Sequence, residues 1–108
     1  MIEKIIKALA EADSEALAKC FSENCMYYDY CPILNGMPNI FVYGNACMEL
    51  LFKKMFVAGD ISVDEPLIES EASASYFGAY GGPYIYARLN IEEYSSDGLV
   101  KKAVVHPA

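Results

Sequence analysis

The sequence predicts an α+β fold in which three helices precede a run of antiparallel strands, with one short strand between the second and third helices. Two observations carry this prediction. Up to residue 60, most apolar side chains recur at the spacing of helical turns, and after residue 60 they alternate with polar ones at the two-residue period of strands. Helices and strands that are segregated in this way are typical of α+β domains with an antiparallel sheet.

The first two predicted helices lie within the first 21 residues. The first carries a single apolar stripe at positions i, i+3, i+4 and i+7, formed by Ile2, Ile5, Ile6 and Leu9. The second is short and begins at Asp13 and Ser14, whose side chains can accept hydrogen bonds from the free N–H groups of a helix start. Its shared apolar face consists of Leu17, Cys20 and Phe21.

A strand, a loop and a third helix are predicted next. Residues 25–31, with the sequence CMYYDYC, are rich in aromatic residues that favour strands. Residues 32–43 contain prolines, asparagines and a glycine and are predicted as a loop. Gly44 and Asn45 then open a helix whose apolar positions recur between residues 48 and 56, and Gly59 ends it.

Four strands are predicted in the second half, at residues 61–65, 74–80, 84–94 and 99–106. Pro66 lacks a backbone N–H, so the first of them should lie at a sheet edge or contain a bulge. The turns between the others fall at 71–73, at Gly-Gly-Pro (81–83) and at Ser-Ser-Asp-Gly (95–98). An Asp-Gly pair tolerates the positive φ angles of tight hairpins.

Composition limits the classes of function. The 108 residues suffice for one domain, and 55% hydrophobic residues with 21% charged ones indicate a globular chain. The net charge of −7, with no basic run, makes nucleic-acid binding an unfavourable interpretation. No apolar stretch approaches the roughly 20 residues that cross a bilayer, so no membrane partner is expected.

Cysteine content gives a further expectation. The N-terminal segment does not have the pattern of a signal peptide, so we expect a cytoplasmic protein with reduced thiols. The spacing of the cysteines matches no zinc motif, and no metal or other cofactor is expected. The four cysteines are Cys20, Cys25, Cys31 and Cys47.

Three segments are similar to a known family. They are ALAEADSEALAKCFSENCMYYDY near the start, YGNACMELLFKKMF in the middle and NIEEYSSDGLVKKAVVHPA at the end. In their order and spacing they resemble the nuclear transport factor 2-like family, which includes ketosteroid isomerases, polyketide cyclases of the SnoaL type, scytalone dehydratase and limonene epoxide hydrolase. The likeness covers nearly the whole chain.

The resemblance implies a single domain over residues 1–108 with a cystatin-like cone. In such a cone, three N-terminal helices pack in a curved antiparallel sheet of about five strands, and a pocket for a small organic ligand opens between them. The resemblance also implies a homodimer that forms through the sheet. A long aliphatic strand face, formed by Ile85, Ala87, Leu89 and Ile91, is a candidate for that contact.

Asp29 is the candidate general base. It lies in an aromatic strand with no cation nearby in the sequence, and desolvation of a carboxylate raises its pKa and makes it a better base near neutral pH. By resemblance it matches the base of ketosteroid isomerases. The alternative is an aspartate at a strand end that only turns the following loop. Because Asp29 and Tyr27 are two residues apart in the predicted strand, their side chains should lie on the same strand face.

The resemblance also points to an oxyanion donor, but imperfectly. The position of the isomerase tyrosine falls on Ile5, and that of its second aspartate falls on Asn90, which can donate a weaker hydrogen bond. A true steroid isomerase is therefore disfavoured. The final strand, residues 99–106, lacks the carboxylate of the epoxide hydrolases, and a single histidine does not match the dehydratases.

Arg88, the only arginine, leaves two assignments open. Either Tyr86, Arg88 and Asn90 line the pocket, or the aliphatic face of the same strand is the core and Arg88 is exposed or paired with Glu92. The resemblance favours the first assignment, in which Arg88 would hold an anionic or carbonyl-bearing ligand. The candidate ligand-binding residues are Tyr27, Tyr43, Tyr86 and Arg88.

Three functions remain open from the sequence. The first is a cytoplasmic module that binds a small organic ligand in its cone. The second is an enzyme of the isomerase, dehydratase or cyclase kind that uses Asp29 as base and Asn90 as oxyanion donor. The third is a structural homodimer whose cone is filled by its own aromatic side chains.

Overall fold

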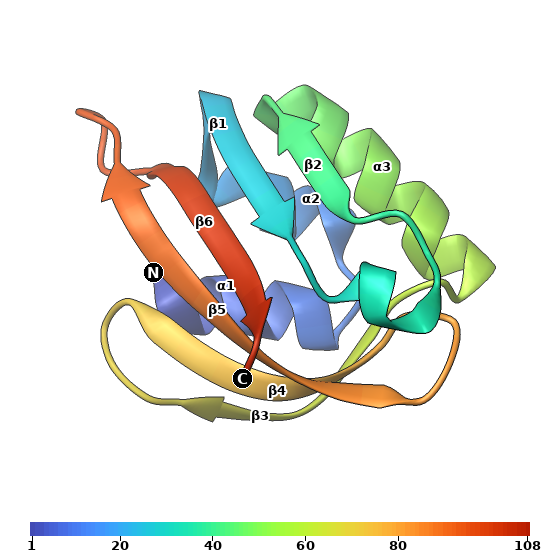
Figure 1. Ribbon diagram of the computed structural model, residues 1–108. Helices are drawn as coiled ribbons and strands as arrows, with labels where there is room; N and C mark the ends of the chain where they lie inside the picture. The colour runs from blue at the N-terminus through green and yellow to red at the C-terminus, as the bar shows by residue number, and fades with distance from the viewer.

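The computed structural model describes residues 1–108 and has the α+β architecture that the sequence predicts (Figure 1). Along the chain the elements are α1 (Ile2–Ala10), α2 (Ser14–Lys19), β1 (Phe21–Asp29), a 3₁₀ turn η1 (Pro32–Asn35), β2 (Ile40–Tyr43), α3 (Asn45–Ala58), β3 (Ser62–Ile68), β4 (Ser73–Ala79), β5 (Tyr84–Tyr94) and β6 (Val100–Pro107). None of the helices combines the length and the apolar character that a membrane crossing requires.

The sheet has six strands in the order β2-β1-β6-β5-β4-β3, one more than the sequence predicts. The additional strand is β2, which lies within the segment predicted as a loop and pairs antiparallel with β1. Ile40 and Val42 are buried in it, whereas Phe41 and Tyr43 are exposed. Four alternating residues directly after a proline-rich turn are too few to stand out as a strand in the sequence.

The sheet is also mixed rather than purely antiparallel. β1 and β6 run parallel, with Tyr27 opposite Ala103 and Asp29 opposite Val105, and every other neighbouring pair is antiparallel. After β1 the chain forms β2, α3 and the strands β3 to β5, and the last strand, β6, then lies beside β1. Parallel pairing requires such a long connection.

β1 begins four residues before the start that the sequence predicts. Phe21, expected in the second helix, is fully buried and pairs with Val100. The register then shifts before Met26, because the polar residues Ser22–Asn24 form an irregular stretch. Helix α2 ends at Lys19 after Asp13 has capped its start by accepting a hydrogen bond from Ala16 N at 3.0 Å.

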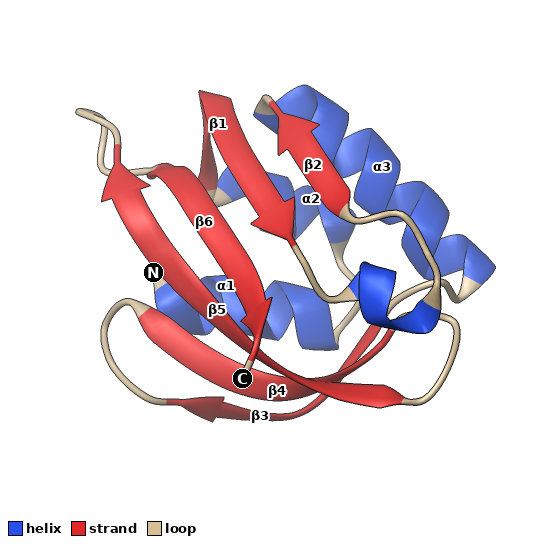
Figure 2. Cartoon of the chain, in the orientation of Figure 1, coloured by secondary structure: helices blue, strands red, loops and turns tan.

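The helices all lie on one side of the sheet and leave the other side uncovered (Figure 2). We call the helix-facing side the inner face and the uncovered side the outer face. Buried side chains from the helices and from the inner face form one continuous core. The bulge expected near Pro66 is confirmed, since the pairing of β3 with β4 shifts register between Asp64 and Leu67.

Candidate functional site

Asp29 ends β1 on the inner face and is completely buried. Its Oδ1 accepts a hydrogen bond from the backbone N–H of Cys31 at 2.9 Å, and its Oδ2 accepts one from the hydroxyl of Tyr80 at 2.6 Å. The first of these bonds turns the chain from β1 into η1, as aspartate side chains commonly do in loops. Each carboxylate oxygen therefore has a partner from within the chain.

Tyr80 reaches Asp29 from the turn between β4 and β5. Its ring folds back over Gly78, where an added Cβ would lie 2.6 Å from a carbon of the Tyr80 ring. Glycine at this position therefore leaves the space that the ring occupies. The Tyr80 hydroxyl also lies 3.4 Å from the hydroxyl of Tyr76, and both tyrosines are buried.

Burial dominates the electrostatics of this cluster. Desolvation raises the pKa of the Asp29 carboxyl above its ordinary value, although the hydrogen bonds from Tyr80 and Cys31 act in the opposite direction. Burial, reinforced by the neighbouring Asp29 charge, raises the pKa of the Cys31 thiol to about 12. Burial also holds the pKa of the Tyr76 and Tyr80 hydroxyls far above the usual range. The cluster is neutral apart from Asp29.

The space around Asp29 is filled rather than open. None of the five principal cavities of the molecule is lined by Asp29, Tyr76 or Tyr80. Tyr27 lies beside them with its hydroxyl buried and without a hydrogen-bond partner. A general base must reach the proton that it removes, whereas both oxygens of this carboxylate are buried and accept hydrogen bonds from within the chain.

The other predicted site residues lie on the outer face. On β5 the aliphatic side chains Ala87, Leu89 and Ile91 are buried on the inner face. Tyr86, Arg88 and Asn90 alternate with them and point away from the helices. The prediction that these three line the interior pocket is therefore wrong. The one-residue slip that it needed does not occur, because β5 pairs regularly up to Ile91 and shifts register only beyond it.

Arg88 is occupied on the outer face. It forms a two-pronged ion pair with Glu69, with its Nε at 2.7 Å from Oε1 and its Nη2 at 3.2 Å from Oε2. This contact raises the pKa of Arg88 and lowers that of Glu69. The structure thus has the second of the two assignments, in which the aliphatic face of β5 is the core. The expected partner was wrong, however, because Arg88 pairs with Glu69, whereas Glu92 pairs with Lys102 at 3.4 Å.

The structure places the predicted site residues in separate groups: Tyr27 and Asp29 lie together in the interior, whereas Tyr86, Arg88 and Asn90 lie together on the outer face of β5. Tyr43 is two-thirds exposed on the outer face, at the far edge from Tyr86. Asn90 faces outward opposite Val104, on the other side of the sheet from Asp29. The chain also contains no group of three or more histidine, cysteine or acidic side chains that could hold a metal ion.

Sequence reasoning missed the partners of Asp29. Tyr76 and Tyr80 were visible only as part of a tyrosine-rich region around the Gly-Gly turn. Tyr80 lies just beyond the end of β4, where the two-residue period of a strand no longer determines the side to which a side chain points. The informative signal is Gly78 between them, because a glycine inside a strand often marks a close approach of another group.

Comparisons with known proteins support this fold through structure alone. A scan against protein-family models and a search of curated proteins both return no match. Among solved structures, a SnoaL-like protein of unknown function from Burkholderia thailandensis superposes with a TM-score of 0.67 at 17% identity, over 99% of this chain and 91% of that one.

This chain has the nuclear transport factor 2-like fold. An NTF2-like protein of unknown function from Cytophaga hutchinsonii matches 97% of this chain and 84% of its own length, with a TM-score of 0.62 and 15% identity. A hypothetical protein with a ketosteroid isomerase-like fold from Catenulispora acidiphila, solved in complex with trimethylamine, gives a TM-score of 0.65 at 12% identity, over 97% and 82% of the two chains. At such identities the likeness concerns the fold.

Proposed function

We propose that this chain is a non-catalytic NTF2-like module whose cone is filled by its own side chains and which forms a homodimer through the outer face of its sheet. The observation that carries the proposal is the closure around Asp29, whose two oxygens accept hydrogen bonds from Tyr80 and Cys31. Catalysis at this carboxylate would require an open path to it. This is the third of the functions that the sequence leaves open.

Aromatic packing in the interior supports the proposal that the chain fills its own cone. The Tyr27 ring meets the ring of Phe21 edge-on at 5.9 Å and the ring of Phe52 at 5.4 Å. Edge-to-face pairs of this kind stabilise a core beyond the area that they bury. These rings, together with Tyr76 and Tyr80, occupy the volume in which a cone of this fold would hold a ligand.

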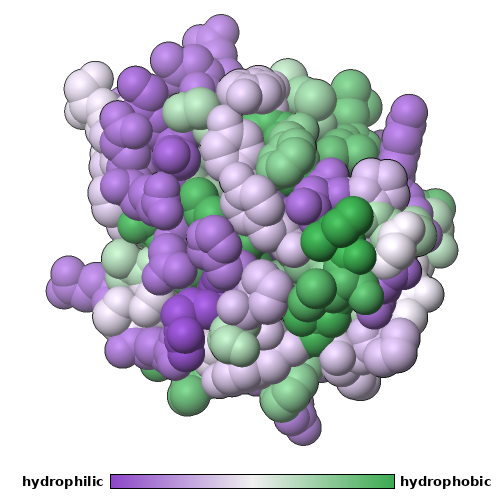
Figure 3. Space-filling model, viewed as in Figure 1, coloured by the Kyte–Doolittle hydropathy of each residue, from purple (hydrophilic) through white to green (hydrophobic).

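The composition of the outer face supports the proposed homodimer. Figure 3 views this face, on which pale and green side chains of low polarity lie across the centre and right, and purple polar ones gather at the left. Aromatic residues of this kind are enriched at the cores of protein interfaces. Partly or largely exposed rings here are Tyr28, Tyr30, Phe41, Tyr43, Phe77, Tyr84 and Tyr86.

Charge favours a second copy of this chain as the partner. The molecule carries a net charge of −7, but four charged side chains of the outer face are paired within it. Arg88 pairs with Glu69 at 2.7 Å, and Lys102 pairs with Glu92 at 3.4 Å. Asp64, opposite Phe77, accepts a hydrogen bond from the Tyr84 hydroxyl at 3.0 Å. The paired charges lower the like-charge repulsion between two such faces.

This dimer surface differs from the one that the sequence suggested. Of the aliphatic residues proposed from the sequence, Ala87, Leu89 and Ile91 are buried on the helix-facing side, and Ile85 is partly buried and packs against the same core. The aromatic residues that alternate with them, such as Tyr84 and Tyr86, are the exposed ones. The proposed contact thus uses the opposite side of the same strand.

Sedimentation equilibrium at micromolar concentration tests the dimer. We expect a species of twice the 11.9 kDa chain mass for the unaltered protein. Phe77→Glu should shift it to the monomer, because two charges would be brought together in an apolar contact. Val57→Glu makes the same charge change at an 84% exposed site on α3 and should leave the dimer intact. A monomeric unaltered protein, or equal effects of both variants, would contradict the proposal.

A further inference from the structure

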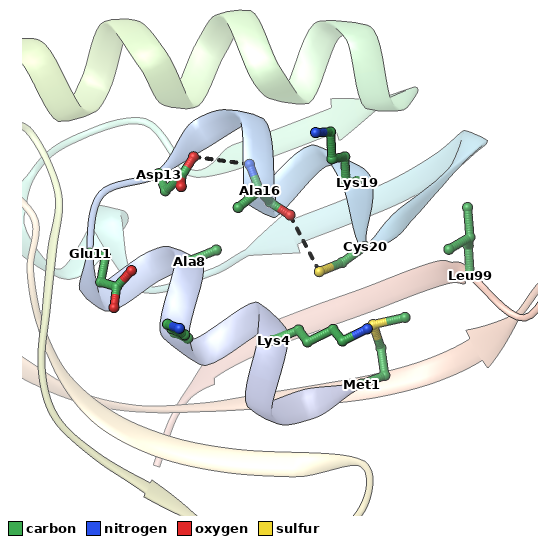
Figure 4. A pocket seen from close by; sticks show the side chains of 10 residues that line it. Met1, Lys4, Ala8, Glu11, Asp13, Ala16, Lys19, Cys20 and Leu99 are labelled. Carbon is green, nitrogen blue, oxygen red and sulfur yellow. Dashed lines mark hydrogen bonds between the residues drawn. The ribbon is translucent and has the colours of Figure 1, made fainter.

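A groove of about 370 Å³ lies between α1 and α2, on the helical side of the molecule (Figure 4). It has no residue in common with the Asp29 cluster and lies away from the outer face of the sheet. Its volume falls within the range of small-molecule sites, roughly 300–1,000 Å³. Both helices, together with the turn before β6, contribute side chains to it.

The groove gathers positive charge. Lys4, Lys7 and Lys19 line it, which is three of the seven lysines in an acidic chain. Lys4 and Lys7 are three residues apart on α1, so they project from the same side of the helix, and neither forms an ion pair. Lys19 pairs only with Glu15, at 3.2 Å, where both side chains are largely exposed.

Two acidic residues, Glu11 and Asp13, also line the groove. Figure 4 shows them at the left, whereas Lys4 extends to the right on the side of Cys20 and Leu99, and Lys19 points away from Lys4. Asp13 is already engaged, since its carboxylate caps α2 by accepting a hydrogen bond from Ala16 N at 3.0 Å. The Lys4 ammonium, which forms no ion pair, is therefore free to meet a negative group.

The floor beneath these lysines is apolar. Ala16, Cys20 and Leu99 lie there, and the Cys20 thiol, which is itself buried, donates to the Ala16 carbonyl at 3.4 Å. Burial raises the pKa of that thiol, while the nearby Lys4 charge lowers it, which is consistent with an ammonium held over this floor. A short side chain at Ala16 leaves the space open.

We propose that this groove binds a small organic anion with an apolar body, such as a medium-chain monocarboxylate. The carboxylate would lie at the Lys4 ammonium, with Lys7 one turn further along α1, and the hydrocarbon chain would cover Ala16, Cys20 and Leu99. Lysine ammoniums are point charges suited to such an anion, and the apolar floor selects for the chain attached to it. The proposal is independent of the dimer, which uses the opposite side of the molecule.

The probe for the test is octanoate, titrated into the ¹⁵N-labelled protein and followed by ¹H–¹⁵N NMR. Saturable shifts should appear at residues of α1, of α2 and of the turn before β6. Acetate, which carries the same charge without the chain, should produce shifts only at far higher concentration. Equal responses to the two anions, shifts confined to other surfaces or no saturable shifts at all would overturn the proposal.

Matched variants separate the groove from general electrostatics. Lys4→Gln with Lys7→Gln should weaken octanoate binding by about fivefold or more, given the size of partly exposed charge pairs. Lys53→Gln with Lys54→Gln removes two unpaired lysines from α3 and should leave the affinity unchanged. Ala16→Leu should block binding by filling the floor, with the remaining NMR spectrum preserved. Equal weakening by both lysine pairs would contradict a site in the groove.

Discussion

The Asp29 side chain lies at the end of β1, is buried, and accepts a hydrogen bond from a tyrosine hydroxyl. The carboxylate accepts a hydrogen bond from Cys31 N, which turns the chain toward η1, and a second one from Tyr80, which lies in the turn after β4. A buried charge is tolerated where hydrogen bonds satisfy it. Under the proposed function its role is structural, because the same hydrogen bonds that stabilise the carboxylate also occupy both of its oxygens.

Burial of Asp29 predicts a pH dependence of stability. Its pKa is raised in the folded state, so between the unfolded value, about 3.9, and the higher folded value the folded state binds the proton more tightly. The stability that this group contributes is full below the unfolded pKa and is lost as pH rises through the folded pKa. Urea unfolding of Asp29→Asn and the unaltered protein across this window should show the variant gaining relative stability as pH rises. A constant difference would contradict this expectation.

Tyr80 should control the titration of Asp29, whereas Arg88 should not. Tyr80→Phe removes a donor that favours the ionised carboxylate, so the pKa of Asp29 should rise further. Arg88→Ala serves as the control, because Arg88 pairs with Glu69 on the other side of the sheet. Carbon-detected NMR titration of the Asp29 carboxyl measures both effects. A fall of this pKa in Tyr80→Phe, or a rise in Arg88→Ala, would be inconsistent with the observed contacts.

At the level of elements, β4 is shaped by the need to place Tyr80. Gly78→Ala would bring a Cβ to 2.6 Å from the Tyr80 ring, and we expect a loss of about 1–3 kcal/mol in the free energy of unfolding, typical of overpacking. In a Tyr80→Ala background the same substitution should cost far less. A double-mutant cycle by urea unfolding measures this coupling. Additive costs would mean that Gly78 does not make room for Tyr80.

Elements that rest on local patterns were predictable from the sequence. The apolar stripe of α1, the third helix and the hairpin at the Asp-Gly turn follow from residues close together in the chain. β2 was not predictable, because its four residues follow a proline-rich turn. The parallel pairing of β1 with β6 was not predictable either, because it joins segments about 75 residues apart.

The candidate site was predictable only in part, for a related reason. The shared face of Tyr27 and Asp29 follows from the two-residue period of one strand and is confirmed. The face that β5 turns inward depends on its pairing with β4 and β6. The resemblance to the nuclear transport factor 2-like family favoured the face of Tyr86, Arg88 and Asn90, which in fact points outward. The contact of Asp29 with Tyr80 spans 51 residues and has no local signature.

At the scale of the whole molecule, the fold separates three environments. The interior of the cone is closed by aromatic rings, the outer face of the sheet is aromatic with paired charges, and the helical side has a lysine-lined groove. A cone that holds its own tyrosine against its own carboxylate has no volume left for a ligand at that point. We therefore propose association at the outer face of the sheet and small-molecule binding on the helical side.

The central claim is that the chain itself closes its cone at Asp29, and the hydroxyl proton of Tyr80 reports on this directly. Proton NMR in water should resolve this hydroxyl as a separate resonance that exchanges slowly with solvent, since the 2.6 Å hydrogen bond is buried. In Asp29→Asn the resonance should move or broaden as its acceptor changes. A Tyr80 hydroxyl in fast exchange with water, together with an Asp29 carboxyl that titrates at its ordinary value, would show an open cone and contradict the account.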